Sequence, residues 1–181
     1  KTNFFKNIGL EYGAKVKIIS RNFPTITDKM PVNFKWVGLI KLILPKAKII
    51  HCVRNSKDTC FSIFKNYFTG NELKYAYTLS EIVDYYNLYS DLMRHWEKIL
   101  PNYIYSVNYQ DLINDPISQI KLLIKSCNLI WNKKCLQFYK NTRPIKTASD
   151  SQARSKIYST SISIWENYSD ELFEEYRNLS N

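Results

Sequence analysis

Residues 48–62, KIIHCVRNSKDTCFS, contain the most informative pattern of this chain. The apolar run 49–53, interrupted only by a histidine, predicts a buried strand. The polar residues after it predict a turn, and the apolar spacing beyond predicts a helix over 56–68. Arg54 therefore ends a strand and faces a helix start, where a guanidinium can give a phosphate two parallel charge-assisted hydrogen bonds. Ser62, farther along the helix, is placed to give a third.

The segment by itself also allows a plainer interpretation, in which Arg54 is a solvated surface charge and Ser62 an ordinary helix residue. The rest of the chain alternates strands with helices, which favours a parallel α/β architecture. The further predicted elements are a strand over 16–19, helices over 34–44, 80–99 and 116–127, a strand over 103–107, a short helix over 131–139 and a last helix over 165–178.

Composition limits the function classes. The chain has 181 residues and a formal net charge of +10, which suits a single domain over 1–181 with anionic partners. A nucleotide with several phosphates fits this charge, and so would RNA or DNA; the lysines are scattered, and we expect no nucleic-acid partner. No apolar run approaches the roughly 20 residues of a membrane helix. We also expect no secretory signal, no membrane span and a cytoplasmic location.

The four cysteines, Cys52, Cys60, Cys127 and Cys135, lack the spacing of a zinc site, and only two histidines accompany them. No metal is therefore expected. Cys52 lies in a predicted core strand and Cys60 on an apolar helix face, so buried free thiols are favoured over disulfides. Free thiols fit a reducing compartment.

Several further short segments of the chain carry a resemblance to a known family, and they stand in the order in which that family has them. They are TDKMPVNF (27–34), GLI (38–40), PKAKIIH (45–51), YYNLY (85–89), LMRHW (92–96), YQDL (109–112), LIW (129–131), CLQF (135–138), TAS (147–149) and QAR (152–154). With 48–62, they resemble sulfotransferases that use 3′-phosphoadenosine 5′-phosphosulfate (PAPS). The similarity runs from about Thr27 to Leu172 and is specific to a bacterial branch, often linked to tetratricopeptide repeats and related to tyrosylprotein sulfotransferases. It implies an α/β, P-loop-NTPase-like fold with a parallel sheet flanked by helices.

The resemblance also implies roles for residues near the strand ends. Arg54 and Ser62 would bind the 3′-phosphate of PAPS, or of its product 3′-phosphoadenosine 5′-phosphate (PAP). Tyr109 matches a tyrosine that touches the adenine ring. A tyrosine at a strand end is equally common in a protein core, so both interpretations of Tyr109 stay open. Asp111, two residues on, is expected to cap the next helix.

Three more residues match the family at other places in the chain. Lys29, in a DKMP turn, would stabilise the negative charge that develops on the bridging oxygen of the leaving nucleotide. Its alternative is a surface lysine paired with Asp28. Ser149 and Arg154 match a basic arm that folds over the cofactor, and an exposed loop without function is the alternative there.

The chain departs from the family in the part of the cofactor site that binds the 5′-phosphosulfate. The family's glycine-bearing loop, whose backbone N–H groups cradle the 5′-phosphosulfate, has no match here, because Gly9 and Gly13 lack the flanking pattern. The acidic base expected after that loop has no match either. We therefore expect an N-terminally truncated sulfotransferase that does not turn over alone. The alternative is a non-catalytic nucleotide-binding module of the same fold. Neither the acceptor, a hydroxyl or an amine, nor the oligomeric state is indicated.

Overall fold

The computed structural model describes the residues 2–20, 23–68, 71–142 and 154–180. They group into two compact units. The first unit combines Lys1–Ile49 with Tyr89–Ile104, and the second combines Ile50–Leu88 with Tyr105–Asn181. The single domain expected from the chain length stays a prediction.

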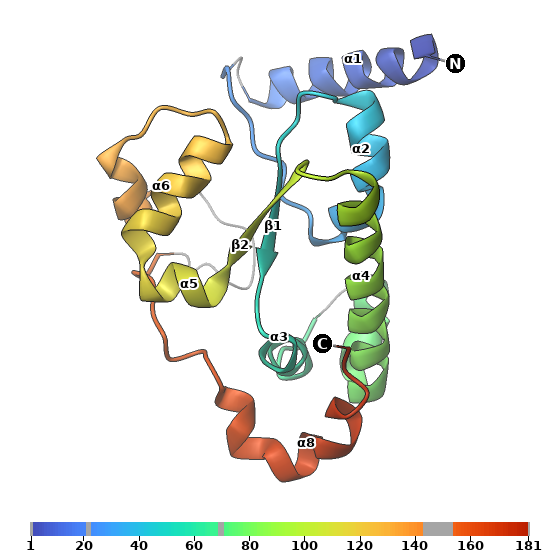
Figure 1. Cartoon of the computed structure of the whole chain (residues 1–181), viewed down its shortest axis with the longest axis vertical. Coiled ribbons are helices and arrows are strands. Elements are labelled where there is room, and N and C mark those ends of the chain that lie inside the picture. The colour runs from blue at the N-terminus through green and yellow to red at the C-terminus, as the bar shows by residue number, and fades with distance from the viewer. Residues whose placement is uncertain (1, 21–22, 69–70, 143–153, 181) are drawn as a thin grey trace. The chain divides into compact units, whose positions relative to one another are not determined.

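Two parallel strands form the sheet of the described residues. β1 (Ile49–Val53) and β2 (Ile104–Asn108) lie side by side and run in the same direction (Figure 1). Both strands and their parallel arrangement agree with the sequence prediction. β1 leads into α3 (Ser56–Phe64), and β2 leads into α5 (Tyr109–Asn114) and then α6 (Pro116–Ser126). The alternation of strands and helices is that of an α/β protein.

The helix after β1 begins as expected and ends earlier than expected. The Asn55 side chain accepts a hydrogen bond from the backbone N–H of Asp58 at 3.1 Å and so caps the first turn. At the other end, the side-chain amide of Asn66 donates to the Ser62 carbonyl, the group that the next helical N–H would otherwise use. α3 therefore ends at Phe64, and the predicted extension to residue 68 is wrong.

Helix caps in the segment after β2 differ from the prediction. Asp111 was expected to cap a helix, but it lies inside the first turn of α5. The caps are Asn108 for α5 and Asp115 for α6, whose side-chain oxygens accept backbone N–H groups at 2.8 and 3.1 Å. Both residues precede their helices directly, which lets the side chain reach the free N–H groups of the first turn.

Helices from the middle and the end of the chain form the core of the second unit. The participating elements besides α3 are η2 (Asn71–Tyr77), the first part of α4 (Leu79–Ile99), η4 (Ile164–Tyr168) and α8 (Ser169–Tyr176). Their buried side chains are those of Cys60, Phe61, Leu79, Ile82, Val83, Leu172 and Tyr176. The helices predicted over 80–99 and 165–178 are confirmed, although the latter begins with a 3-10 turn. The segment predicted as a short helix over 131–139 is the 3-10 helix η3 (Lys133–Lys140).

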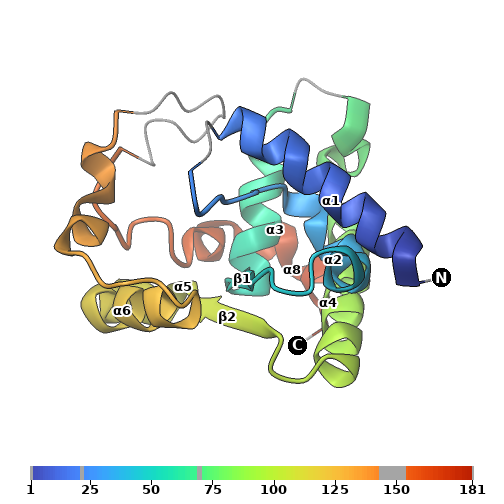
Figure 2. The ribbon, with the colours of Figure 1, turned by 90° about the horizontal axis from the view of Figure 1, so that it is seen from above.

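The first unit begins with a helix where the sequence predicted a strand. α1 (Thr2–Ile19) includes residues 16–19, so the strand prediction is wrong. The reason is the spacing of the less exposed residues over the whole segment, which is helical. They are Phe5, Ile8, Gly9, Tyr12, Gly13 and Val16. α1 packs against α2 (Val37–Ile43), which follows the 3-10 helix η1 (Pro31–Trp36), and Figure 2 shows α1 crossing α2.

An aromatic side chain from α4 packs on α2 within the first unit. The Trp96 ring lies so close to Gly38 that an added Cβ would be 2.8 Å from it. Trp96 also donates its ring N–H to the Phe34 carbonyl at 2.8 Å. Trp36, the last residue of η1, is 54% exposed. Leu88 on α4 is 68% exposed.

The cysteines are free thiols, as predicted, but only one is fully buried. Cys60 lies in the core of the second unit. Cys52 is exposed, contrary to the prediction, whereas the other residues of β1 are half-buried. Burial raises the pKa of the Cys60 thiol from 9.0 to about 12.

We expect Cys60 to resist alkylation in the folded protein while Cys52 reacts. A pKa raised to about 12 lowers the thiolate fraction at pH 8 about a thousandfold, and the thiolate is the reactive form. A timed iodoacetamide reaction, read by peptide mass spectrometry, measures both sites in one sample. Urea-unfolded protein is the control in which both cysteines react. Equal rates at the two sites in the folded state would show that Cys60 is accessible.

No helix of the described residues is both long enough and apolar enough to cross a membrane.

Candidate functional site

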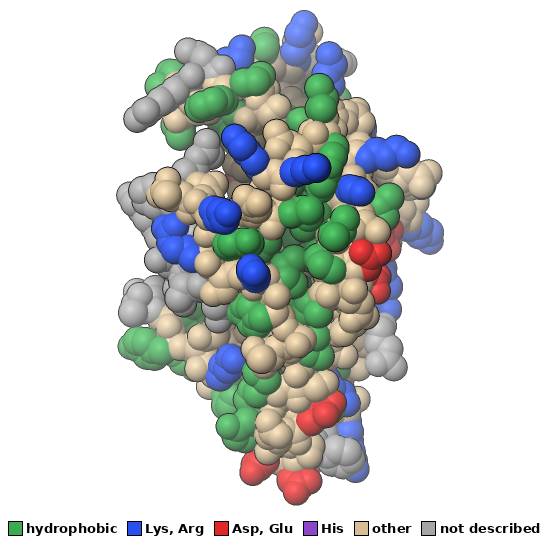
Figure 3. All heavy atoms as spheres, turned by 90° about the vertical axis from the view of Figure 1, so that its left-hand side faces the viewer, with side chains coloured by type: hydrophobic (Ala, Val, Ile, Leu, Met, Phe, Trp, Pro, Cys, Tyr) green, Lys and Arg blue, Asp and Glu red, His purple; other side chains and the backbone are tan. Residues whose placement is uncertain are grey.

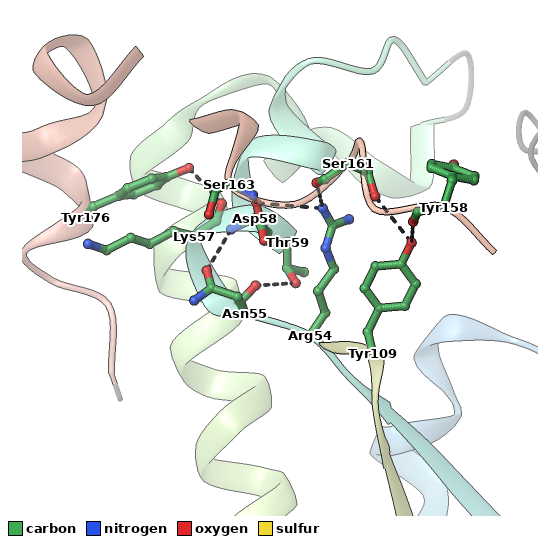
Figure 4. A network of polar contacts seen from close by, with 10 residues as sticks. All are labelled: Arg54, Asn55, Lys57, Asp58, Thr59, Tyr109, Tyr158, Ser161, Ser163 and Tyr176. Atoms are coloured by element: carbon green, nitrogen blue, oxygen red, sulfur yellow. Dashed lines mark hydrogen bonds and ion pairs between the residues drawn. The ribbon is translucent and has the colours of Figure 1, made fainter. Parts of the chain in front are cut away.

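The centre of the candidate site is Arg54, which directly follows β1 in the second unit. Its Nη2 donates a hydrogen bond to the Ser161 carbonyl and lies 3.8 Å from the Asp58 carboxylate (Figure 4). The guanidinium carbon also lies 5.4 Å from the centre of the Tyr109 ring. The Arg54 side chain is 26% exposed, so these contacts hold a partly buried cation in a defined orientation.

Tyr109 enters the same site from the end of β2. It is the first residue of α5, and the carboxyl ends of neighbouring parallel strands meet at one edge of a sheet. Its hydroxyl donates to the Tyr158 carbonyl at 3.4 Å and lies 3.3 Å from the Ser161 hydroxyl. Arg54 and Tyr109, which the sequence assigned to one ligand, are thus neighbours in the structure.

Asp58 is the buried acidic residue of the site, with 4% of its surface exposed. One carboxylate oxygen accepts the backbone N–H of Ser163 at 2.8 Å, and the same oxygen faces Arg54. Ser163 adopts a left-handed backbone conformation, φ 55°, just before η4. Nearby, the Tyr176 hydroxyl donates to the Lys57 carbonyl at 3.0 Å. Residues 158–163 are therefore fastened to the strand ends and to the start of α3.

Tyr176 remains a neutral donor over the physiological range. Burial, reinforced by the nearby Cys60 and Asp58, raises the pKa of its phenol above the ordinary value of 10.0. The hydrogen bond to Lys57 is therefore present at neutral pH, and it joins α8 to the start of α3.

Ser62 is half-buried on α3, nearly two turns beyond the first residue of the helix. It belongs to the same unit as Arg54, and the helix that carries it starts directly beside that arginine. Its role in binding stays a prediction.

Lys29 is exposed in the extended segment before η1 and belongs to the first unit, whereas Arg54, Ser62 and Tyr109 belong to the second. The neighbouring Asp28 accepts hydrogen bonds from the Tyr12 hydroxyl at 2.6 Å and from the Asn33 amide at 3.4 Å. The hydrogen bond to Asp28, together with burial, raises the pKa of Tyr12 to about 12. Asp28 thus holds η1 and α1 together beside Lys29.

The predicted basic arm is described only at its end. Ser149 lies outside the described residues. Arg154 is exposed, and its Nη1 donates to the Asn141 carbonyl at 2.7 Å. Both assignments stay predictions.

The sequence predicted no role for residues 158–163, which bring backbone groups to Arg54 and Asp58. Nothing in their composition signals contact with Arg54, which lies 107 positions away from Ser161. Asp58 lies in the first turn of α3, four positions after Arg54, which precedes the helix. A carboxylate also suits the positive end of the helix dipole at that place, so the sequence alone does not assign Asp58 to Arg54.

Basic side chains form no dense patch on the face that Figure 3 shows. On the face shown in Figure 3, Lys and Arg side chains are spread among apolar ones. A continuous basic stripe, which is typical of nucleic-acid-binding proteins, is not visible on that face. In the described part of the chain, no group of three or more His, Cys, Asp or Glu side chains is arranged to hold a metal ion.

Comparison with known proteins gives two matches. The sequence profile described as "Sulfotransferase family" matches residues 10–133. A protein of Aquifex aeolicus (strain VF5), named "Uncharacterized protein", is 37% identical over 165 residues. That alignment covers 90% of this chain and 22% of the Aquifex protein, so the chain spans about a fifth of the length of this curated relative.

Proposed function

Because this chain belongs to the sulfotransferase family, we propose that it contributes the 3′-phosphate and adenine half of a PAPS site. The complete protein would be a PAPS-dependent sulfotransferase of the bacterial, tetratricopeptide-repeat-linked branch, with the P-loop-like fold of that family. Its PAP product would bind in the same place. The acceptor would be a hydroxyl or an amine.

The observation that carries the proposal is the meeting of Arg54 and Tyr109 at the ends of two parallel strands. Ligands of open α/β sheets bind at the carboxyl ends of the strands. The Nε of Arg54 is buried and has no hydrogen-bond partner among the described residues. A buried donor without a partner is costly, and a phosphate oxygen would supply the missing acceptor.

Arg54 retains donors for a ligand although its Nη2 already contacts protein. A guanidinium has five N–H groups in a planar fork. Contacts to Ser161 and Asp58 involve Nη2, so the Nε and Nη1 groups have donors left to offer. Ser62, on the adjacent helix, would add a hydroxyl. Such charge-assisted hydrogen bonds are about twice as strong as neutral ones.

Tyr109 would contact the adenine. Its ring already lies against the Arg54 guanidinium, so a base placed near it would have an aromatic side chain next to the phosphate-binding cation. Its hydroxyl would keep its position through Tyr158 and Ser161. The ring and the arginine would thus recognise adjacent parts of one nucleotide.

The proposed reaction is an in-line displacement at sulfur. The acceptor oxygen or nitrogen forms a bond to sulfur, loses its proton to a base, and the bond from sulfur to the bridging oxygen of the 5′-phosphate breaks. The leaving group, PAP, carries the electron pair of that bond. Lys29 would stabilise the charge developing there. Ser149 and Arg154 would close over the nucleotide.

Isothermal titration with a set of isomeric nucleotides tests the proposal. We expect adenosine 3′,5′-bisphosphate to bind about tenfold or more tightly than adenosine 2′,5′-bisphosphate or 5′-AMP, because only the first carries a phosphate placed for Arg54. The two bisphosphates have the same charge, so a difference between them reports geometry. Equal affinity for both would overturn the proposal. Tighter binding of single-stranded RNA, with a steep salt dependence, would favour nucleic-acid binding instead.

A nucleotide-binding module without catalysis is the alternative. It would bind adenosine 3′,5′-bisphosphate equally well. Sulfate transfer from PAPS by the full-length protein separates the two functions, and no turnover with several hydroxyl and amine acceptors would favour the module.

A further inference from the structure

Asp58 joins three separate parts of the second unit at one carboxylate. It belongs to α3, its Oδ1 accepts the Ser163 N–H at 2.8 Å, and the same oxygen lies 3.8 Å from Nη2 of Arg54. With 4% of its surface exposed, it is nearly shielded from water. A buried carboxylate is unfavourable unless it is paired and hydrogen-bonded, and Arg54 and Ser163 provide both.

Nη2 of Arg54 is held by two oxygens. The Ser161 carbonyl accepts its hydrogen bond, and the Asp58 carboxylate supplies the negative charge. The segment that carries Ser161 is itself tied to Asp58 two residues later, at Ser163. Removing the carboxylate would therefore loosen the arginine directly and through the segment that binds it.

We propose that Asp58 is a positioning residue of the 3′-phosphate site, acting through Arg54 and Ser163. The carboxylate holds Nη2 on the protein side, so that Nε and Nη1 are presented to the phosphate. This proposal rests on the proposed function for its ligand. Its structural half, the orientation of Arg54 by Asp58, does not depend on which nucleotide binds.

Asp115 provides a matched control in the same unit. Its carboxylate also accepts a backbone N–H at the start of a helix, from Ser118 at 3.1 Å. It is exposed, and its place at the start of α6 makes it a helix cap. Asp115→Asn therefore makes the same chemical change at a carboxylate that accepts a backbone N–H but does not contact Arg54.

The Asp58→Asn variant separates charge from the hydrogen bond. An amide oxygen can still accept the Ser163 N–H, but it does not pair with the guanidinium. We expect affinity for adenosine 3′,5′-bisphosphate to fall about tenfold, while affinity for 5′-AMP stays within about twofold of the wild type. Asp58→Ala, which also releases Ser163, should lose more. In the Arg54→Lys background, Asp58→Asn should cause no further loss, because the effect passes through Arg54.

A second readout needs no nucleotide. The Nε–H signal of Arg54 in nitrogen-15 NMR spectra, assigned by its disappearance in Arg54→Lys, reports how firmly the side chain is held. We expect slow exchange with water in the wild type and in Asp115→Asn. In Asp58→Asn we expect exchange to be faster by about fivefold or more, because the guanidinium gains rotational freedom.

The two readouts distinguish the possible failures. If the wild type does not discriminate the 3′-phosphate but the Arg54 signal depends on Asp58, the proposed function fails and the orienting role of Asp58 holds. If the Arg54 signal is unchanged in Asp58→Asn, the positioning role is overturned. Equal or tighter 3′-phosphate binding by Asp58→Asn also overturns it, because the carboxylate would then contribute nothing to binding.

Discussion

Arg54→Lys is expected to lower affinity for adenosine 3′,5′-bisphosphate about a hundredfold, or roughly 2.7 kcal/mol. Lysine keeps the positive charge, so Asp58 retains a cation nearby and the fold should be preserved. An ammonium cannot bind the Ser161 carbonyl and present a planar pair of donors to a phosphate at the same time. Affinity for 5′-AMP, which lacks the 3′-phosphate, should change by less than about twofold. Isothermal titration of both nucleotides measures the difference.

Arg94→Lys is the matched control. Arg94 lies on α4, is largely exposed and pairs with Asp91 three positions earlier. Exposed pairs of this kind contribute little to stability, so its replacement should leave both affinities unchanged. A loss of less than about threefold in Arg54→Lys would show that the bidentate contact is not made. An equal loss for both nucleotides would assign Arg54 to the fold instead of to the 3′-phosphate.

Gly9→Ala is expected to lower the free energy of unfolding by about 3 kcal/mol. A Cβ at this position would lie 1.9 Å from the carbonyl oxygen of Ile43 and 2.9 Å from its carbonyl carbon. Both atoms are backbone atoms at the end of α2, so no side-chain rotation relieves the overlap. The two helices must move apart, and the contacts between α1 and α2 are lost. Urea denaturation followed by circular dichroism measures the change.

Gly13→Ala, one turn further along α1, is the control for this prediction. No atom lies within 4 Å of a Cβ added there, so the methyl group meets open space. Alanine is favoured over glycine in a helix interior by roughly 0.5–1 kcal/mol, so this variant should be more stable than the wild type. A destabilised Gly13→Ala together with a neutral Gly9→Ala would show that α1 does not pack on α2 as described.

Elements with a strong local signal were predictable from the sequence. The run 49–53 forms β1, the cap at Asn55 starts α3, and the apolar periodicity over 80–99 forms α4. α1 was mispredicted because its four residues 16–19, taken alone, resemble a strand. Its helical spacing becomes clear only over several turns, and the packing of Gly9 on Ile43 confirms which face is covered.

Some residues of the candidate site could likewise be placed from the sequence, and others could not. The sequence placed Arg54 and Tyr109 at strand ends, and parallel strands bring such residues to one edge. The position of Lys29 relative to that edge depends on how the first unit is placed. Ser149 and most of its arm lie outside the described residues.

By itself, the sequence determined the strand, arginine, turn and helix of residues 49–64, because each depends on neighbours within a few positions. Only the tertiary structure decided what faces the arginine. The Ser161 carbonyl and the Ser163 N–H come from a segment more than a hundred positions later in the chain. Every residue carries a backbone carbonyl, and every residue except proline carries a backbone N–H. No side-chain pattern can therefore predict these two contacts, which depend on where the fold places residues 161–163.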